Sequence, residues 1–337
     1  MEVTKELKRI CKVDKIYHCA SGTEANMAAV KLARSYQSHI GYQSKQKLIL
    51  FDICFHGWGE SVINKMSSGI NTKDVIILKR NGFESIKYIQ DNADSIACIL
   101  FETKMGLDID ASRKVSYNEE VQFISTLRRV THDNNIILIW DEVISGFRYS
   151  LGGAKEFFGM NENSADFPDI TTYGKIPGGG LPCGFIGFKN KLHHYFNKND
   201  NKLLFNWGTY SQHPFLMKSM KYTIERLHNS NNDGKYNKLN ACTQSLVDSI
   251  NNDNNITKFG FSAQCCCSFF LIYNQSHPNC IKVLTYYLNM NGILVHTYSS
   301  STLQLSFSHS NNICKELHIR IKQAVEEIID DGWLSLQ

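Results

Sequence analysis

Apolar positions in the first half of the chain follow two periods, one typical of helices and one of buried strands. Residues 22–36 (GTEANMAAVKLARSY) repeat small apolar side chains every three or four positions, which predicts an amphipathic helix. The expected apolar face contains Ala25, Ala28, Ala29, Leu32 and Ala33. Residues 118–134 show the same period with Asn118 as the expected cap, and 84–92 a shorter helix. The apolar positions of the longer helix are Val121, Ile124, Leu127 and Val130.

Short apolar runs separate these helices and are expected to be strands. They cover residues 47–54, 95–101, 136–140 and 182–188. The run at 136–140, IILIW, is apolar at every position, which is typical of a parallel strand covered by helices on each side. Because such strands alternate with helices, the sequence predicts an α/β fold with a parallel sheet and right-handed crossovers.

A long helix expected at 214–228 is followed by the polar stretch HNSNNDG, which is typical of a domain boundary. Beyond it the pattern predicts strands around 257–273, a helix near 278–290, a strand near 293–297 and a final helix at 311–331. We therefore expect a large domain at 1–228 and a smaller α+β domain at 229–337.

The composition and net charge of the chain limit the kinds of partner and binding site that we expect. A net charge of +4 over 337 residues is too small to indicate nucleic acid or a membrane surface as partner, and no apolar run is long enough to span a membrane. Eleven cysteines without a CxxC pair argue against a zinc site and for a reducing compartment. The adjacent Cys265, Cys266 and Cys267 are expected in a buried strand, since alternating side chains cannot all face one metal ion. With no apolar signal region at the start of the chain, we expect a cytoplasmic protein without a metal site.

Candidate chemistry begins with Ser21–Ala25, a small polar turn that opens the helix at 22–36. The first turn of a helix leaves N–H groups unpaired, and Gly22 would let a ligand approach the backbone, so the turn is a candidate phosphate site. The alternative is a simple N-cap, in which Ser21 or Thr23 satisfies the helix end.

Two other candidates follow expected strands. Asp141 and Glu142 end the strand IILIW, and ligands of open α/β sheets bind beyond such ends, where a carboxylate would pair with a cationic ring nitrogen. The alternative is a helix cap or a surface salt bridge. Phe55 follows another strand and would stack on a planar ring, or else belong to the core.

Lys175 stands in TTYGKIPGGGLP, where three consecutive glycines permit backbone torsions closed to other residues. A lysine in a packed, partly dry pocket has a lowered pKa and becomes a nucleophile able to form a Schiff base. The alternative is a solvated loop lysine. Thr209, in the turn GTYS before the helix at 214–228, is a second candidate phosphate ligand or a helix cap.

Together and in this order, these motifs resemble those of the class III aminotransferases, which are fold-type I pyridoxal-phosphate (PLP) enzymes. The matching stretches are SGTEANMAAVKLAR, FHGWGES, LIWDEVISGFR, TTYGKIPGGGLPCGFIGF and GTYSQHP. Within the family, the loop FHGWGESVINKMSSGI is most similar to that of the glutamate-1-semialdehyde 2,1-aminomutases. The resemblance implies a mostly parallel, seven-stranded-type sheet with helices on both faces, a smaller α+β C-terminal domain, PLP as cofactor and a homodimer.

Position by position, the resemblance also implies roles for single residues. Lys175 would form the Schiff base, and Asp141 would pair with the pyridine nitrogen. The remaining cofactor contacts would be Phe55 and Val143 on the two ring faces, and Gly22, Thr23 and, from the neighbouring subunit, Thr209 at the phosphate. Second-layer positions behind these would be Ser21, His56 and Glu102.

The implied activity is an aminotransferase or aminomutase reaction on a small amino acid, amine or semialdehyde. A racemase or decarboxylase on the same cofactor is the alternative. In the family a long further segment precedes SGTEA, whereas here twenty residues precede Ser21. Three interpretations stay open: a naturally short chain, a fragment or inactive homologue, and a separate polypeptide that supplies the segment.

Overall fold

The computed structural model describes residues 2–52, 54–59, 73–80, 82–103, 117–160, 167–196, 208–274, 276–295 and 302–334. Two compact units make up the chain. The first contains Met1–Thr103 and Asn118–Asn229, and the second contains Ser230–Gln337. Each unit has its own sheet and its own apolar core.

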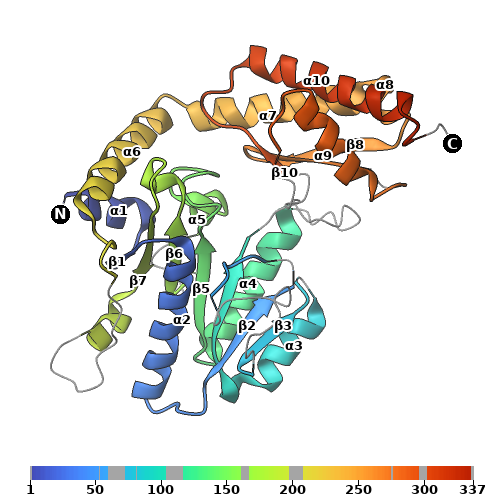
Figure 1. The fold of residues 1–337 in the computed structure, drawn as a ribbon. Coiled ribbons are helices and arrows are strands. Elements are labelled where there is room, and N and C mark those ends of the chain that lie inside the picture. Colours follow the sequence, from blue (N-terminus) through green and yellow to red (C-terminus); the bar gives the residue numbers. More distant parts are fainter. Residues whose placement is uncertain are drawn as a thin grey trace. The chain divides into compact units, whose positions relative to one another are not determined.

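The first unit is built on a seven-stranded sheet with the order β1-β7-β6-β5-β4-β2-β3 (Figure 1). The strands are β1 (Lys15–Cys19), β2 (Lys47–Phe51), β3 (Val75–Leu78), β4 (Ile96–Glu102), β5 (Ile137–Glu142), β6 (Ile170–Gly174) and β7 (Gly184–Phe188). Pairing is parallel from β3 through β6, and β7 runs antiparallel to both of its neighbours. The expected mostly parallel sheet is therefore confirmed.

Helices cover both faces of this sheet. Its α-helices are α1 (Glu2–Cys11), α2 (Gly22–His39), α3 (Phe83–Asp91), α4 (Tyr117–Asp133), α5 (Gly153–Phe157) and α6 (Pro214–Asn232). Leu50 belongs to the core cluster that contains the alanine face of α2, whereas the rings of Phe51 and Phe101 contact Phe123 of α4 at centroid distances of 5.6 and 5.9 Å. Since consecutive strand residues point to opposite faces, α2 and α4 lie on opposite sides.

Helix ends and short strands depart most from the expectations. The helix α4 begins at Tyr117, so Asn118 lies in its first turn and is not the cap, which must precede the first helical residue. The strand expected at 47–54 ends at Phe51. The edge strand β1 was not expected, because its five half-polar residues carry no clear period.

The second unit combines a small antiparallel sheet with helices, as expected for the C-terminal part. Its sheet has the order β10-β9-β8, from β8 (Phe261–Cys266), β9 (Phe269–Asn274) and β10 (Thr302–Gln304). The helices are α7 (Lys235–Asn252), α8 (Asn254–Thr257), α9 (Cys280–Met290) and α10 (Asn311–Asp330). The strand expected near 293–297 is absent from its described part, Ile293–Val295. Residues 296 and 297 lie outside the described residues.

The three adjacent cysteines are only partly in a strand. Strand β8 ends at Cys266, and Cys267 opens the tight turn to β9 with a φ of 54°. The expectation of one buried strand through all three is therefore wrong for Cys267, because the hairpin reverses there. All eleven cysteines are free thiols. No helix in the described parts of the chain has the length and apolar character needed to cross a membrane.

Candidate active site

A pocket of about 260 Å³ lies in the first unit, where several strands reach their carboxyl ends. Its wall includes residues that follow β1, β2, β5 and β6 along the chain. Most of the residues singled out from the sequence line it: Ser21, Gly22, Thr23, Phe55, His56, Val143 and Lys175. Stretches that are more than 150 residues apart in sequence thus share one cavity, as the convergence of strand ends in an α/β sheet favours.

The turn at Ser21 begins helix α2 and forms one wall of the pocket. Ser21 has extended torsions and is the N-cap, accepting a hydrogen bond from the Glu24 N–H at 3.2 Å. The Glu24 carboxylate in turn accepts one from the Ala20 N–H at 2.8 Å. The N-cap interpretation is therefore confirmed for Ser21. Gly22 and Thr23 are the first two helical residues, and an α-helix leaves the N–H groups of these positions without an internal acceptor.

Two glycines allow the pocket walls to approach each other. A Cβ added to Gly22 would lie 2.6 Å from Cγ1 of Val143, a separation that atoms cannot adopt. Gly57 has a φ of 104°, and its Cβ would lie 2.3 Å from Oγ1 of Thr23. Because only glycine fits at either place, the first turn of α2 packs directly against the segments that follow β2 and β5.

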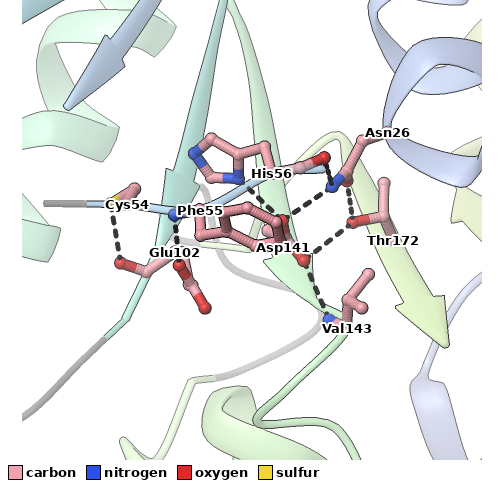
Figure 2. A network of polar contacts seen from close by, with 8 residues as sticks. All are labelled: Asn26, Cys54, Phe55, His56, Glu102, Asp141, Val143 and Thr172. Carbon is pink, nitrogen blue, oxygen red and sulfur yellow. Dashed lines mark hydrogen bonds and ion pairs between the residues drawn. The ribbon is translucent and has the colours of Figure 1, made fainter. Parts of the chain in front are cut away.

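Asp141 lies beneath the pocket at the end of β5, with 1% of its surface exposed. Its Oδ2 accepts hydrogen bonds from Nδ1 of His56 at 2.7 Å and Nδ2 of Asn26 at 2.8 Å, and its Oδ1 accepts one from the Val143 N–H at 2.8 Å (Figure 2). Asp141 does not itself line the pocket, but Asn26, His56 and Val143 do. The carboxylate is thus held immediately behind the pocket wall.

The contact between Asp141 and His56 sets the charge of both groups. Burial lowers the pKa of His56, but the hydrogen bond and negative charge of Asp141, together with the contact with Cys54, outweigh it and raise the pKa to about 10. Burial raises the pKa of Asp141, and the contact with His56 outweighs that effect and lowers it. At neutral pH the pair therefore consists of an aspartate and a protonated histidine.

Sequence reasoning missed two residues of this cluster, Asn26 and Thr172. The side chain of Asn26 also donates to the His56 carbonyl at 2.9 Å and accepts a hydrogen bond from Oγ1 of Thr172 at 2.6 Å. Both residues are fully buried. One signal was available: Asn26 is a polar residue that interrupts the small apolar face of an alanine-rich helix.

Phe55 and Glu102 lie on the side of the cluster formed by the ends of β2 and β4. The Phe55 ring is 58% exposed, while its backbone N–H donates to Oε2 of the buried Glu102 at 3.0 Å. Cys54 donates its thiol hydrogen to the Glu102 carbonyl at 3.6 Å. Glu102 therefore fixes the backbone from which the aromatic ring projects, in agreement with a place behind the pocket surface.

Lys175 follows β6 and lines the pocket, but it is exposed. This exposure agrees with the solvated alternative and not with the packed, partly dry position expected from the sequence. Its backbone has φ 59° and ψ −97°, a combination that costs free energy in any residue with a Cβ. A hydrogen bond from the Gly178 N–H to the Lys175 carbonyl, at 3.0 Å, closes this turn. Strained backbone of this kind clusters at functional sites.

Two other candidate residues lie elsewhere. Thr209 is exposed, precedes α6 and is not part of the pocket wall. Glu142 is buried on the opposite side of β5 from Asp141 and accepts hydrogen bonds from the N–H groups of Ala154 and Lys155 at 3.0 and 3.1 Å. Glu142 thus binds the first turn of α5, as the helix-cap alternative predicted.

Comparison with known proteins indicates the same family that the sequence motifs resemble. The model of the aminotransferase class-III family matches residues 1–260. Glutamate-1-semialdehyde 2,1-aminomutase from Ignicoccus hospitalis is 35% identical over 230 residues, which are 64% of this chain and 50% of that protein. The chain spans about half the length of the curated relatives it matches first.

Solved structures share the fold at lower identity. An omega-transaminase from Sphaerobacter thermophilus has a TM-score of 0.81 and 21% identity, covering 96% of this chain and 77% of that one. A structure described as a transaminase with PLP bound has a TM-score of 0.82 and 20% identity, covering 98% and 78%. The fold expected for the first unit and its smaller companion is confirmed. On the match of the family model, this chain belongs to the class III aminotransferase family.

Proposed function

We propose that the chain binds pyridoxal phosphate and transfers an amino group as an aminotransferase or aminomutase. One observation carries the proposal: a buried, ionised carboxylate, Asp141, lies behind a pocket that Lys175 also lines. The family and the PLP-bound transaminase of the same fold support the choice of cofactor.

The chemistry of the pocket fits this cofactor. A phosphate needs N–H donors, which Gly22 and Thr23 offer at the start of α2. A pyridinium nitrogen needs a carboxylate, and Asp141 is one whose lowered pKa keeps it charged. The flat ring needs apolar groups on its two faces, for which Phe55 and Val143 are the proposed partners.

PLP supplies an electron-accepting ring conjugated to the reacting carbon. Asp141 would keep the proton on the ring nitrogen. Lys175 would hold the cofactor through its amine. The same amine would serve as general base and acid for the proton that moves during the reaction.

The substrate is proposed to be a small amino acid, amine or semialdehyde. An aminomutase reaction is favoured by the similarity to glutamate-1-semialdehyde 2,1-aminomutase, which covers half of that protein. A homodimer in which Thr209 reaches the neighbouring cofactor's phosphate, and a cytoplasmic location, belong to the same proposal. The separate polypeptide considered above does not, because none of the observations supports it.

The first experiment follows the visible absorbance of the purified chain after addition of pyridoxal phosphate. The wild type is expected to gain a band that Lys175→Ala lacks, because that variant has no amine at the pocket. Lys282→Ala removes an exposed lysine of α9 and should behave as wild type. An identical spectrum for wild type and Lys175→Ala would refute the proposal.

Products then separate the possible reactions. Incubation with an amine donor and a keto acceptor should yield the exchanged pair, whereas a semialdehyde alone should rearrange if the chain is an aminomutase. Racemised substrate or released carbon dioxide without amino transfer would instead favour the racemase or decarboxylase alternative.

A further inference from the structure

The orientation of the Asn26 side chain is fixed by its partners. Its Nδ2 lies 2.9 Å from the His56 carbonyl and 2.8 Å from Oδ2 of Asp141. A carbonyl and an ionised carboxylate only accept hydrogen bonds, so the NH₂ group must face them. The Asn26 Oδ1 is then left to accept the hydroxyl hydrogen of Thr172, whose oxygen lies 2.6 Å away. A chain of donors therefore runs in one direction, from Thr172 through Asn26 to Asp141.

This direction decides how the lone pairs of Asp141 are used. A threonine hydroxyl has one hydrogen, and the short contact with Asn26 commits it, so the 3.4 Å contact of Thr172 with Oδ1 of Asp141 adds no second donation. Oδ2 of Asp141 receives two N–H groups, one from Asn26 and one from His56. Among the described residues, Oδ1 receives only the N–H of Val143, so it keeps an acceptor position.

From this arrangement we propose that Thr172 and Asn26 are positioning residues that reserve Oδ1 of Asp141 for the N–H of the cofactor's ring nitrogen. Oδ2 is held by the two protein donors, and Oδ1 is the oxygen that would accept the cofactor's N–H. This inference rests on the proposed function, since it concerns the hold of the same site on pyridoxal phosphate. Both residues act through Asp141 and are not themselves assigned a contact with the cofactor.

Thr172 is the most informative position to change, because its hydroxyl is the first donor in the series of hydrogen bonds that leads to Asp141. Valine has nearly the same shape but no donor, so Thr172→Val would leave the buried Oδ1 of Asn26 without a hydrogen and release the amide from its fixed orientation. Serine keeps the hydroxyl, so Thr172→Ser should restore the arrangement.

The test uses full-length protein loaded with pyridoxal phosphate and two readouts that do not depend on turnover. The dissociation constant of the cofactor should rise about three- to tenfold in Thr172→Val, the effect of losing one hydrogen bond. The pH midpoint of the visible band should also rise. A ring nitrogen held less firmly in its protonated form withdraws fewer electrons from the lysine-bound nitrogen, which then keeps its proton to higher pH. Thr172→Ser should match the wild type in both.

A matched control separates positioning from packing. Thr131→Val removes another fully buried hydroxyl, one that donates to the Arg128 carbonyl within α4 at 2.8 Å. It should lower stability without moving the midpoint or the dissociation constant.

Wild-type values for Thr172→Val, or equal shifts in Thr131→Val, would overturn the inference while leaving the proposed function intact. The absence of any band in the wild type would refute the proposed function and this inference together.

Discussion

Asp141 and Glu142 are consecutive carboxylates at the end of β5, both buried, yet they lie in opposite environments. Because side chains alternate along a strand, Asp141 faces the helix α2 and the pocket, whereas Glu142 faces α5. Their pKa values move in opposite directions, lowered for Asp141 and raised for Glu142. The comparison shows how a carboxylate that is available to a ligand differs from one that stabilises the fold.

Burial disfavours the charged form of both groups and is the largest influence on each. For Asp141 the direct contact with His56 outweighs it, since a protonated ring nitrogen lies 2.7 Å away. For Glu142 the charge of Lys155 and the hydrogen bonds from Ser145, Ala154 and the Lys155 N–H lower the pKa, but they do not fully compensate for burial.

The Lys155 ammonium group donates its hydrogen bonds to groups other than the Glu142 carboxylate. Its Nζ donates to the Cys11 carbonyl at 3.1 Å, to Oγ1 of Thr171 at 3.0 Å and to the Tyr173 hydroxyl at 2.8 Å. Burial lowers its pKa to about 8, which the charge of Glu142 only partly opposes. This second cluster therefore joins α1, α5 and β6.

The largest expected difference between the Asp141 face and the Glu142 face of β5 is in the effect of substitutions on enzymatic activity. Asp141→Asn removes the charge at the ring nitrogen and should lower the rate of amino transfer on the order of a thousandfold. Glu142→Gln should cost about 1–3 kcal/mol of unfolding free energy and retain the cofactor band. Steady-state rates and urea titrations of the two variants check this. Normal turnover in Asp141→Asn would contradict the role of Asp141 as the carboxylate that acts on the cofactor.

The second expected effect concerns stability on the Glu142 side. Lys155→Met removes the donor that three buried acceptors share and should lower the free energy of unfolding by about 2–4 kcal/mol. Equilibrium urea unfolding measures it, with the exposed Lys282→Met as matched control. A loss no greater than that of the control would mean that the Lys155 cluster does not hold the face together.

The two buried cations should also show opposite pH dependence. The pKa of His56 rises from 6.5 to about 10 on folding, so its stabilising contribution is complete below pH 6.5 and is lost as pH rises through 10. The pKa of Lys155 falls from 10.5 to about 8, so the cost of burying its charge diminishes as pH rises from 8 towards 10.5.

Unfolding free energies of wild type, His56→Gln and Lys155→Met between pH 6.5 and 10 test these signs. The advantage of the wild type should shrink relative to the His56 variant and grow relative to the Lys155 variant. Parallel trends would show that the two faces do not differ in this way.

The smallest expected effect is at Ser145, whose hydroxyl donates to Glu142. Ser145→Ala should cost about 1 kcal/mol, the value of one hydrogen bond, because the hydrogen bonds from the Ala154 and Lys155 N–H groups to Glu142 are kept. The pH midpoint of the cofactor band should stay at the wild-type value. A shifted midpoint would indicate that Glu142 influences the pocket across the strand.

Local pattern was enough to find some of the elements around the site, although β1 and β6 were not among the expected strands. The alanine face at 22–36 became the buried face of α2, and the apolar run IILIW supplied the first four residues of β5. Polar turns at the ends of these elements were identified as candidates because glycine, hydroxyl and carboxylate groups recur there. The resemblance to a family then assigned roles that no single motif could.

The sequence by itself determined the α/β alternation and the helix faces, since each depends on the period of nearby side chains. Tertiary structure alone decided that Asn26 and Thr172, 146 residues apart, form one hydrogen-bonded series beside Asp141, and that Lys175 lines the pocket and is exposed. The physical reason is that hydrogen-bond partners and solvent exposure depend on which strands become neighbours, and that order carries no local periodic signal.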